Sequence, residues 1–135
     1  MANIIQTKHL GQARMQLTFT ANGAQVCTDA PQAFGGRGEQ PSPVQLMAAS
    51  LAACALTTFC MAAMKNGIST DGFTAEVEDI QYNDSHDAVK RVAIRFHLSA
   101  AVPADMRKRL EAYAHRGCTV GNTLTLEKDF IFEYE

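Results

Sequence analysis

The sequence is organised around one long apolar stretch, PSPVQLMAASLAACALTTFCMAAMK, which occupies residues 41–65. A helix that starts near Pro43 has Ser42 in the N-cap position and proline at the first helical position, and both features favour helix initiation. Lys65 suits the negative C-terminal end of the helix dipole, and Gly67 favours a left-handed helix end. We therefore predict a helix of about 22 residues, roughly 33 Å long.

The length of this stretch raises the question of a membrane span. Residues 46–64 carry no charge, and their number is close to what a span needs. Most of them are alanine, which is only weakly apolar, and the sequence has no second segment of this kind. A helix that is apolar on most faces can instead form the buried centre of a soluble protein. We expect the latter, with no membrane partner.

Strand patterns flank the predicted helix on both sides. The Asn22-Gly23 pair is typical of a hairpin turn, and short alternating runs on either side of it indicate two strands. The other elements are expected at residues 15–19 and 25–28 (strands), 74–82 and 91–98 (strands), 103–117 (helix) and 124–134 (strand). This ββ-α-ββ-α-β order predicts an α+β fold, in a single domain spanning residues 1–135. One small sheet cannot cover the long helix, so we expect its remaining surface to meet a second copy of the chain in a homodimer.

Composition excludes several classes of function. The net charge is −2 and tryptophan is absent, which argues against a nucleic-acid partner bound by a basic face or by base stacking. The first six residues lack the charged and apolar regions of a secretory signal, so we expect a cytoplasmic protein with reduced thiols. No HExxH, GxGxxG or Walker pattern occurs, and the four histidines are scattered, so we expect no metal and no cofactor.

The four cysteines, at positions 27, 54, 60 and 118, are the strongest chemical candidates. Their spacing excludes a zinc ribbon or a thioredoxin-type CxxC site. Cys54 lies in the middle of the predicted helix, where it is either a small buried side chain or a reactive thiol. Cys118 follows a helix-ending glycine in a loop, where it is either a thiol that is free to move or a cysteine that packs the loop. Cys27 and Cys60 are expected to be structural.

The stretch from Pro41 to Cys54 resembles the OsmC/Ohr family (osmotically inducible protein C and organic hydroperoxide resistance protein). In that family, an alanine-rich helix carries a cysteine eleven residues after the initial proline, and Pro43 and Cys54 have this spacing. The family's second motif is a Cys-Pro-Val-Ser loop after a short helix. Residues 118–124 are similar to it, with Thr119 and Gly121 as departures. The resemblance covers essentially the whole chain.

This resemblance implies an intertwined α+β homodimer with two active sites at its interface, and a peroxiredoxin-like antioxidant activity in the oxidative stress response. Cys54 would be the peroxidatic thiolate, which attacks an organic hydroperoxide and becomes a sulfenic acid. Cys118 would resolve the sulfenic acid as a disulfide, and a cellular dithiol would reduce that disulfide. The resemblance implies no metal and no flavin.

The activity requires a cation beside the thiol, because a cysteine of ordinary pKa is only about 3% ionised at pH 7. The family supplies an arginine from the N-terminal hairpin or the following loop. The candidates here are Arg14 and Arg37, of which the glycine-flanked Arg37, in the sequence Gly35-Gly36-Arg37-Gly38, is slightly favoured. We interpret that glycine cluster as a mobile loop rather than an anion cradle.

One departure from the family weakens the prediction of activity. Peroxidase members have a glutamate directly after the helix-start proline, and it holds the arginine in place. Val44 stands there in this sequence, and valine accepts no hydrogen bond; Glu39 is an alternative acceptor. Two further readings therefore stay open: a dimer of the same fold that binds a small lipophilic ligand, and a structural or regulatory dimer with inert thiols.

Overall fold

The computed structural model describes residues 3–135, which form two three-stranded sheets and three α-helices. The α+β class is as predicted, with one strand and one short helix more than the sequence indicated. The chain divides into two compact units, with the boundary between Met47 and Ala48. We describe the first unit (to residue 47) and the second unit (from residue 48) separately. A single domain over residues 1–135 stays a prediction.

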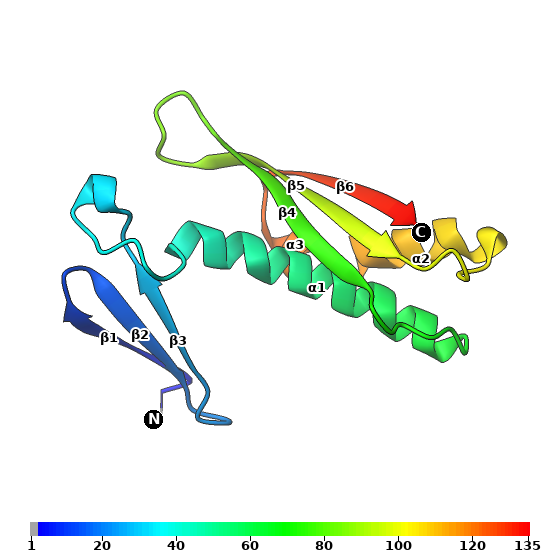
Figure 1. The fold of residues 1–135 in the computed structure, drawn as a ribbon, viewed down its shortest axis with the longest axis horizontal. Helices are drawn as coiled ribbons and strands as arrows, with labels where there is room; N and C mark the ends of the chain where they lie inside the picture. Colours follow the sequence, from blue (N-terminus) through cyan, green and yellow to red (C-terminus); the bar gives the residue numbers. More distant parts are fainter. Residues whose placement is uncertain (1–2) are drawn as a thin grey trace. The chain divides into compact units, whose positions relative to one another are not determined.

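The first unit is an antiparallel sheet of β1 (Ile5–Gly11), β2 (Arg14–Phe19) and β3 (Gln25–Asp29), in that order (Figure 1). The predicted Asn-Gly turn joins β2 to β3, with Gly23 at a positive φ of 70°. Strand β1 was not predicted from the sequence. Its residues are exposed except for Gly11, so neither face carries the apolar alternation that reveals a half-buried strand.

Helix α1 (Pro43–Lys65) has the predicted ends. At its start, the Ser42 hydroxyl accepts a hydrogen bond from the Gln45 backbone N–H at 3.1 Å, and the Gln45 side chain accepts one from the Ser42 N–H at 3.0 Å. These reciprocal bonds satisfy two of the backbone donors that a helix start leaves unpaired. At the other end, Gly67 has a positive φ of 70°, the left-handed conformation that terminates helices.

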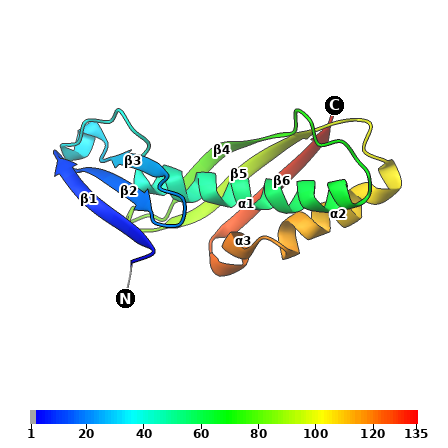
Figure 2. The same cartoon turned by 90° about the horizontal axis from the view of Figure 1, so that it is seen from below.

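The second unit combines the rest of α1 with a mixed sheet of β4 (Thr74–Tyr82), β5 (Val89–Leu98) and β6 (Glu127–Tyr134). Strands β4 and β5 are antiparallel, and β5 and β6 are parallel. Helices α2 (Ala104–Arg116) and α3 (Thr119–Thr123) form the connection between the parallel strands. Figure 2 shows α1 and α2 on the same face of this sheet. The short helix α3 replaces the loop that we expected after Gly117.

The hydrophobic core lies in the second unit. Phe59 of α1 is fully buried, and its ring stacks on Phe132 of β6 with centroids 6.0 Å apart. Phe132 also stacks on the buried Phe96 of β5 at 4.7 Å. Ile94 and Leu98 continue the same buried face of β5, as its alternating pattern predicted. This core fixes α1 against the sheet and so fixes the position of Cys54.

Candidate functional site

Cys54 lies in the middle of α1 and is partly exposed. One turn further along, the Thr58 hydroxyl donates a hydrogen bond to the Cys54 carbonyl oxygen at 2.9 Å. The end of α2 approaches the helix at this turn. A Cβ atom on Gly117 would lie 2.7 Å from Thr58 Cγ2, so only glycine allows so close an approach. This close approach places the next residue, Cys118, near α1.

Cys118 is fully buried, so of the two interpretations of this residue the structure agrees with a packed cysteine rather than a freely moving one. It is the N-cap of α3, and its Sγ accepts a hydrogen bond from the Gly121 backbone N–H at 3.2 Å. The Cys54 side chain lies near this thiol and raises its pKa. The structure therefore brings together the two thiols, which are 64 residues apart (118 minus 54) in the chain.

Several groups act on the pKa of the Cys118 thiol. Burial, the largest cause, raises this pKa, and the contact with Cys54 raises it further. The Gly121 N–H and the charge of Lys128 act in the opposite direction. Two neighbouring thiols allow oxidation of one sulfur to be followed by a disulfide with the other.

At Gly121, the departure from the family's second motif is explained by close packing around the Cys118 sulfur. Its Cα is so close to the thiol that a Cβ would lie 3.2 Å from Cys118 Sγ and 3.4 Å from Leu51 Cδ1. A larger residue would crowd the sulfur or displace the turn. Glycine therefore lets the backbone N–H reach the Cys118 sulfur directly.

Arg14 is held in a polar network within the first unit. Its Nε and Nη2 atoms donate to the two carboxylate oxygens of Asp29, each at 2.7 Å, and Nη2 also reaches Glu39 at 3.0 Å. The Asp29 side chain is fully buried and also accepts hydrogen bonds from the backbone N–H groups of Glu39 and Gln40, both at 2.9 Å. These contacts, with Arg14 as the largest cause, hold the pKa of Asp29 well below its usual range. The carboxylate therefore stays ionised at neutral pH.

Sequence reasoning missed Asp29 as the partner of Arg14. Glu39 was considered as a substitute for the family's glutamate, and it does contact Arg14, but its side chain is 66% exposed. Asp29 and Arg14 are directly opposite each other on β3 and β2. The predicted strand of residues 25–28 ends one residue before Asp29. Extending it by that residue, in the register set by the hairpin turn, would have placed Asp29 opposite Arg14. Val44 is part of the first turn of α1 and is half-buried.

Arg37 has a different environment. Its backbone carbonyl accepts a hydrogen bond from Gln32 Nε2 at 3.3 Å, and within residues 3–135 its guanidinium has no ion-pair partner. The surrounding glycine loop is tied down by backbone hydrogen bonds from Gly36 to Pro31 and from Gly38 to Ala30. A Cβ on Gly36 would lie 1.9 Å from the Ala30 carbonyl oxygen, so glycine is required there. This close packing differs from the mobile loop that we expected.

A surface cavity of about 300 Å³ lies between the C-terminal half of α1 and the end of α2 in the second unit, and neither Cys54 nor Cys118 lines it. Its lining includes Thr58, one helical turn after Cys54, and Gly117, which directly precedes Cys118. Met61 and Tyr113 contribute apolar surface, and Lys65 adds a positive charge. The cavity therefore has room for an organic molecule with an apolar body.

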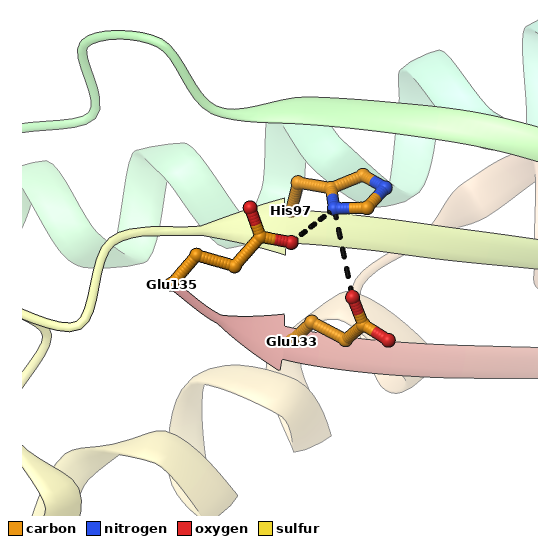
Figure 3. Close-up of side chains that lie close together, drawn as sticks. All are labelled: His97, Glu133 and Glu135. Atoms are coloured by element: carbon orange, nitrogen blue, oxygen red, sulfur yellow. Dashed lines mark hydrogen bonds and ion pairs between the residues drawn. The ribbon is translucent and has the colours of Figure 1, made fainter.

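A second cluster of titratable groups lies on the sheet face opposite the core. Figure 3 shows His97 of β5 beside Glu133 and Glu135, and its Nδ1 forms a hydrogen bond with Glu135. Ligand atoms of these three residues lie within 4.8 Å of one another, a spacing that one metal ion can bridge. Glu133 is, however, also paired with Arg95. Since all these side chains reach solvent and an arginine already neutralises one of them, we interpret the cluster as ion pairs across an exposed sheet face.

The remaining thiols lie outside the Cys54–Cys118 pair. Cys27 on β3 and Cys60 on α1, which we expected to be structural, are both half-buried. Burial raises the pKa of the Cys60 thiol, which disfavours its reactive thiolate form.

Helix α1 is long and apolar enough to cross a membrane, and it is the only such helix among residues 3–135. One helix of this kind is weak evidence, because the core helix of a soluble protein passes the same test. Its side chains Leu51, Ala55 and Phe59 are fully buried against the rest of the second unit. The packing therefore favours a core helix.

Comparison with known proteins supports the resemblance seen in the sequence. The family model described as OsmC-like protein matches residues 36–133. A structure from Psychrobacter arcticus, described as an osmotic stress induced and detoxification response protein, is 25% identical with a TM-score of 0.91, covering 98% of this chain and 97% of that one. No curated protein matches the sequence.

Two further solved structures share the fold. An organic hydroperoxide resistance protein OsmC from Legionella pneumophila is 24% identical with a TM-score of 0.66, covering 98% of this chain and 96% of that one. An organic hydroperoxide resistance protein from Elizabethkingia anophelis is 16% identical with a TM-score of 0.73, covering 100% of this chain and 99% of that one. At these identities the likeness concerns the fold.

Proposed function

Because the chain belongs to the OsmC-like protein family, we propose that it is a thiol-dependent peroxidase that reduces organic hydroperoxides in the cytoplasm. The family and its hydroperoxide-resistance members support a peroxide-related stress function. The observation that carries the finer proposal is that Cys54 lies close enough to Cys118 to raise the pKa of its thiol. Oxidative stress defence is the corresponding physiological role.

The proposed reaction uses both thiols in turn. The Cys54 thiolate attacks one peroxide oxygen, so an S–O bond forms as the O–O bond breaks, and the alcohol leaves after taking a proton. The Cys118 thiolate then attacks the Cys54 sulfenic acid, forming the disulfide and releasing water once the hydroxide is protonated. A cellular dithiol supplies the two electrons that restore both thiols and is itself oxidised to a disulfide. No metal or cofactor takes part.

An arginine is proposed to stabilise the Cys54 thiolate and orient the peroxide. Of the two candidates, we favour Arg14, because Asp29 and Glu39 hold its guanidinium in one orientation. Its Nη1 atom has no hydrogen-bond partner among residues 3–135, so two donors stay available for substrate. In this proposal Asp29 performs the task that the family's glutamate performs at the position of Val44. Arg37 is the alternative.

We propose that the protein is a homodimer. Large apolar side chains of α1, Met61 and Met64, are 55% and 63% exposed, and uncovered apolar surface of this kind marks an interface. The first unit has no buried apolar side chain among residues 3–47, and a three-stranded sheet needs a covered hydrophobic face to be stable. Sedimentation equilibrium at micromolar concentration tests the proposal. We expect a dimer, and a monomer would refute it.

The cavity at Thr58 and Gly117 favours one alternative function, the binding of a small lipophilic ligand without turnover. Its volume of about 300 Å³ and its apolar residues Met61 and Tyr113 suit such a ligand. A Cys54→Ser, Cys118→Ser double variant separates the two functions. If the double variant still binds a fluorescent fatty acid as tightly as wild type, and wild type consumes no hydroperoxide, the alternative replaces the peroxidase.

The direct test of the peroxidase is titration of the reduced protein with cumene hydroperoxide, followed by mass spectrometry. We expect a Cys54–Cys118 disulfide in the wild type and a trapped Cys54 sulfenic acid in Cys118→Ser. Cys54→Ser should lower kcat/KM by at least about 10³-fold, as removal of a nucleophile does. Cys60→Ser, six residues further along the same helix, is the matched control and should keep full activity. If excess peroxide leaves Cys54 unmodified, the proposed function is wrong.

A further inference from the structure

Lys128, the second residue of β6, is bound to the turn that carries Cys118. Its Nζ donates a hydrogen bond to the Gly121 carbonyl oxygen at 2.7 Å and another to the Leu124 carbonyl oxygen. Both acceptors lie at the end of α3, where helical carbonyl groups lack partners within the helix. The Lys128 side chain is half-buried, so these bonds are partly shielded from water. The lysine thus clamps α3 from the side of the sheet.

This clamp acts on the residue that contacts the sulfur. The Gly121 N–H donates to Cys118 Sγ at 3.2 Å, while the carbonyl of the same glycine accepts from Lys128. Residues 119–120 and 122–123 of α3 hold no charged side chain. Among the side chains of residues 3–135 that shift the pKa of the Cys118 thiol, Cys54 raises it and the charge of Lys128 lowers it. Lys128 therefore acts on this thiol through its charge and through the turn to which it is bound.

We propose that Lys128 is a positioning residue that fixes the turn of residues 118–124 and stabilises Cys118 as a thiolate. The inference rests on the proposed function, because a Cys118 thiolate is needed there twice. It is the nucleophile when the Cys54 sulfenic acid is resolved, and it is the leaving group when the disulfide is reduced.

Exposure decides which sulfur the reductant attacks. Cys118 is fully buried, whereas Cys54 is partly exposed. A dithiol thiolate can therefore reach Cys54 Sγ, where a new S–S bond forms as the Cys54–Cys118 bond breaks. The electron pair of the broken bond stays on Cys118 Sγ, beside the Gly121 N–H and the charge of Lys128. The second thiol of the reductant then displaces Cys54, leaving the reductant as a disulfide. A leaving thiol of lower pKa departs faster, so Lys128 favours this step.

The test measures the ionisation of Cys118 without requiring turnover. In a Cys27→Ser, Cys54→Ser, Cys60→Ser background, Cys118 is the one remaining cysteine, and its ionisation is followed against pH by the ultraviolet absorbance of the thiolate, which needs no reagent to reach the buried sulfur. Lys128→Met should move the midpoint of this profile upward by about one pH unit, the size expected when a nearby opposite charge is lost. Lys128→Arg should keep the midpoint near that of the background variant alone. Lys90→Met, at an exposed lysine of β5, is the matched control and should leave it unchanged.

A second measurement follows the chemistry in the Cys54-containing protein. A rise of one unit in the pKa of Cys118 lowers the fraction of thiolate about tenfold, while each thiolate becomes about threefold more nucleophilic. Disulfide formation after one equivalent of peroxide should therefore slow roughly threefold. Should Lys128→Met perturb folding, Lys128→Gln retains hydrogen-bond donors without the charge and should give the same upward shift.

The outcomes separate the two proposals. An unchanged ionisation midpoint of Cys118 in both neutral variants, or an arginine variant that behaves like the methionine variant, overturns the role of Lys128 even if the peroxidase is active. An upward shift with rescue by arginine supports the thiolate-stabilising role. If that shift occurs but Cys54 does not react with peroxide, the peroxidase proposal fails and the leaving-group role fails with it.

Discussion

The two units of the chain are stabilised by different kinds of interaction. In the second unit, aromatic and aliphatic side chains such as Phe59, Phe96 and Leu51 are fully buried in one hydrophobic core. Among residues 3–47 of the first unit, the buried residues are Thr28, Asp29 and Gly36, none of which is a large apolar residue. The centre of that unit is an ion pair, between Arg14 and Asp29.

This difference corresponds to a division of the proposed chemistry. The thiols need a rigid frame that holds two sulfurs in contact, and a close-packed apolar core provides it. The arginine needs a fixed orientation in which some of its N–H donors stay available for substrate. A buried carboxylate that binds two of its nitrogens provides that orientation. Damage to the core should therefore unfold the protein, whereas damage to the ion pair should change local order and activity.

The largest effect is expected from Phe59→Ala. The ring is fully buried and contacts Phe73 and Phe132, so its removal leaves a cavity in the core. The free energy of unfolding should fall by about 3–5 kcal/mol, as measured by urea denaturation. Phe34→Ala is the matched control in the first unit, since that ring is 82% exposed, and it should change the stability by less than about 0.5 kcal/mol. Equal losses in the two variants would contradict the comparison.

An intermediate effect is expected from Asp29→Asn. The amide cannot accept the charged two-nitrogen contact from Arg14, so the guanidinium and the backbone at Glu39 and Gln40 should lose order. We expect faster hydrogen exchange at these two amides, an unchanged second unit, and up to about 10²-fold lower peroxide turnover, since misplaced catalytic groups carry a cost of this size.

The matched control for this variant is Asp84→Asn, at an exposed aspartate of the β4–β5 loop, which should behave as wild type. The pH dependence adds a second check. Because the pKa of Asp29 is lowered, its stabilising effect is present above the usual value of 3.8 and is lost only as the pH falls through the lowered pKa. Protection of the Glu39 and Gln40 amides that disappeared already at pH values near 4 would argue against the network.

The smallest effect is expected on the exposed sheet face, from His97→Gln. Contacts with Glu135, and then with Glu76, raise the pKa of His97 above its usual 6.5. The protonated histidine therefore adds stability that is fully present below about pH 6.5 and is lost as the pH rises through the raised pKa. The urea midpoint of wild type should fall slightly between about pH 6 and about pH 9 relative to that of the variant. A change as large as that of Phe59→Ala would mean that this face is not a set of solvent-exposed ion pairs.

Much of the fold followed from local patterns in the sequence. Ser42, Pro43 and Gly67 predicted the two ends of α1, because helix starts and ends depend on the backbone preferences of single residues. The alternation around Val92 and Phe96 predicted β5, since one face of that strand is buried. Strand β1 was not predicted because its side chains are exposed on both faces. Helix α3 was not predicted because five residues are too few for a periodic pattern.

The sequence by itself determined which groups could do chemistry: two cysteines at family spacing, two arginines and a valine in place of a glutamate. Only the tertiary structure decided how they are held. Contact between Cys54 and Cys118 depends on packing α2 against α1 at Gly117, and the partner of Arg14 depends on the register of β2 with β3. Both relations join residues distant in the chain, and such long-range pairing is set by the packing and hydrogen bonding of whole elements rather than by the preferences of neighbouring residues.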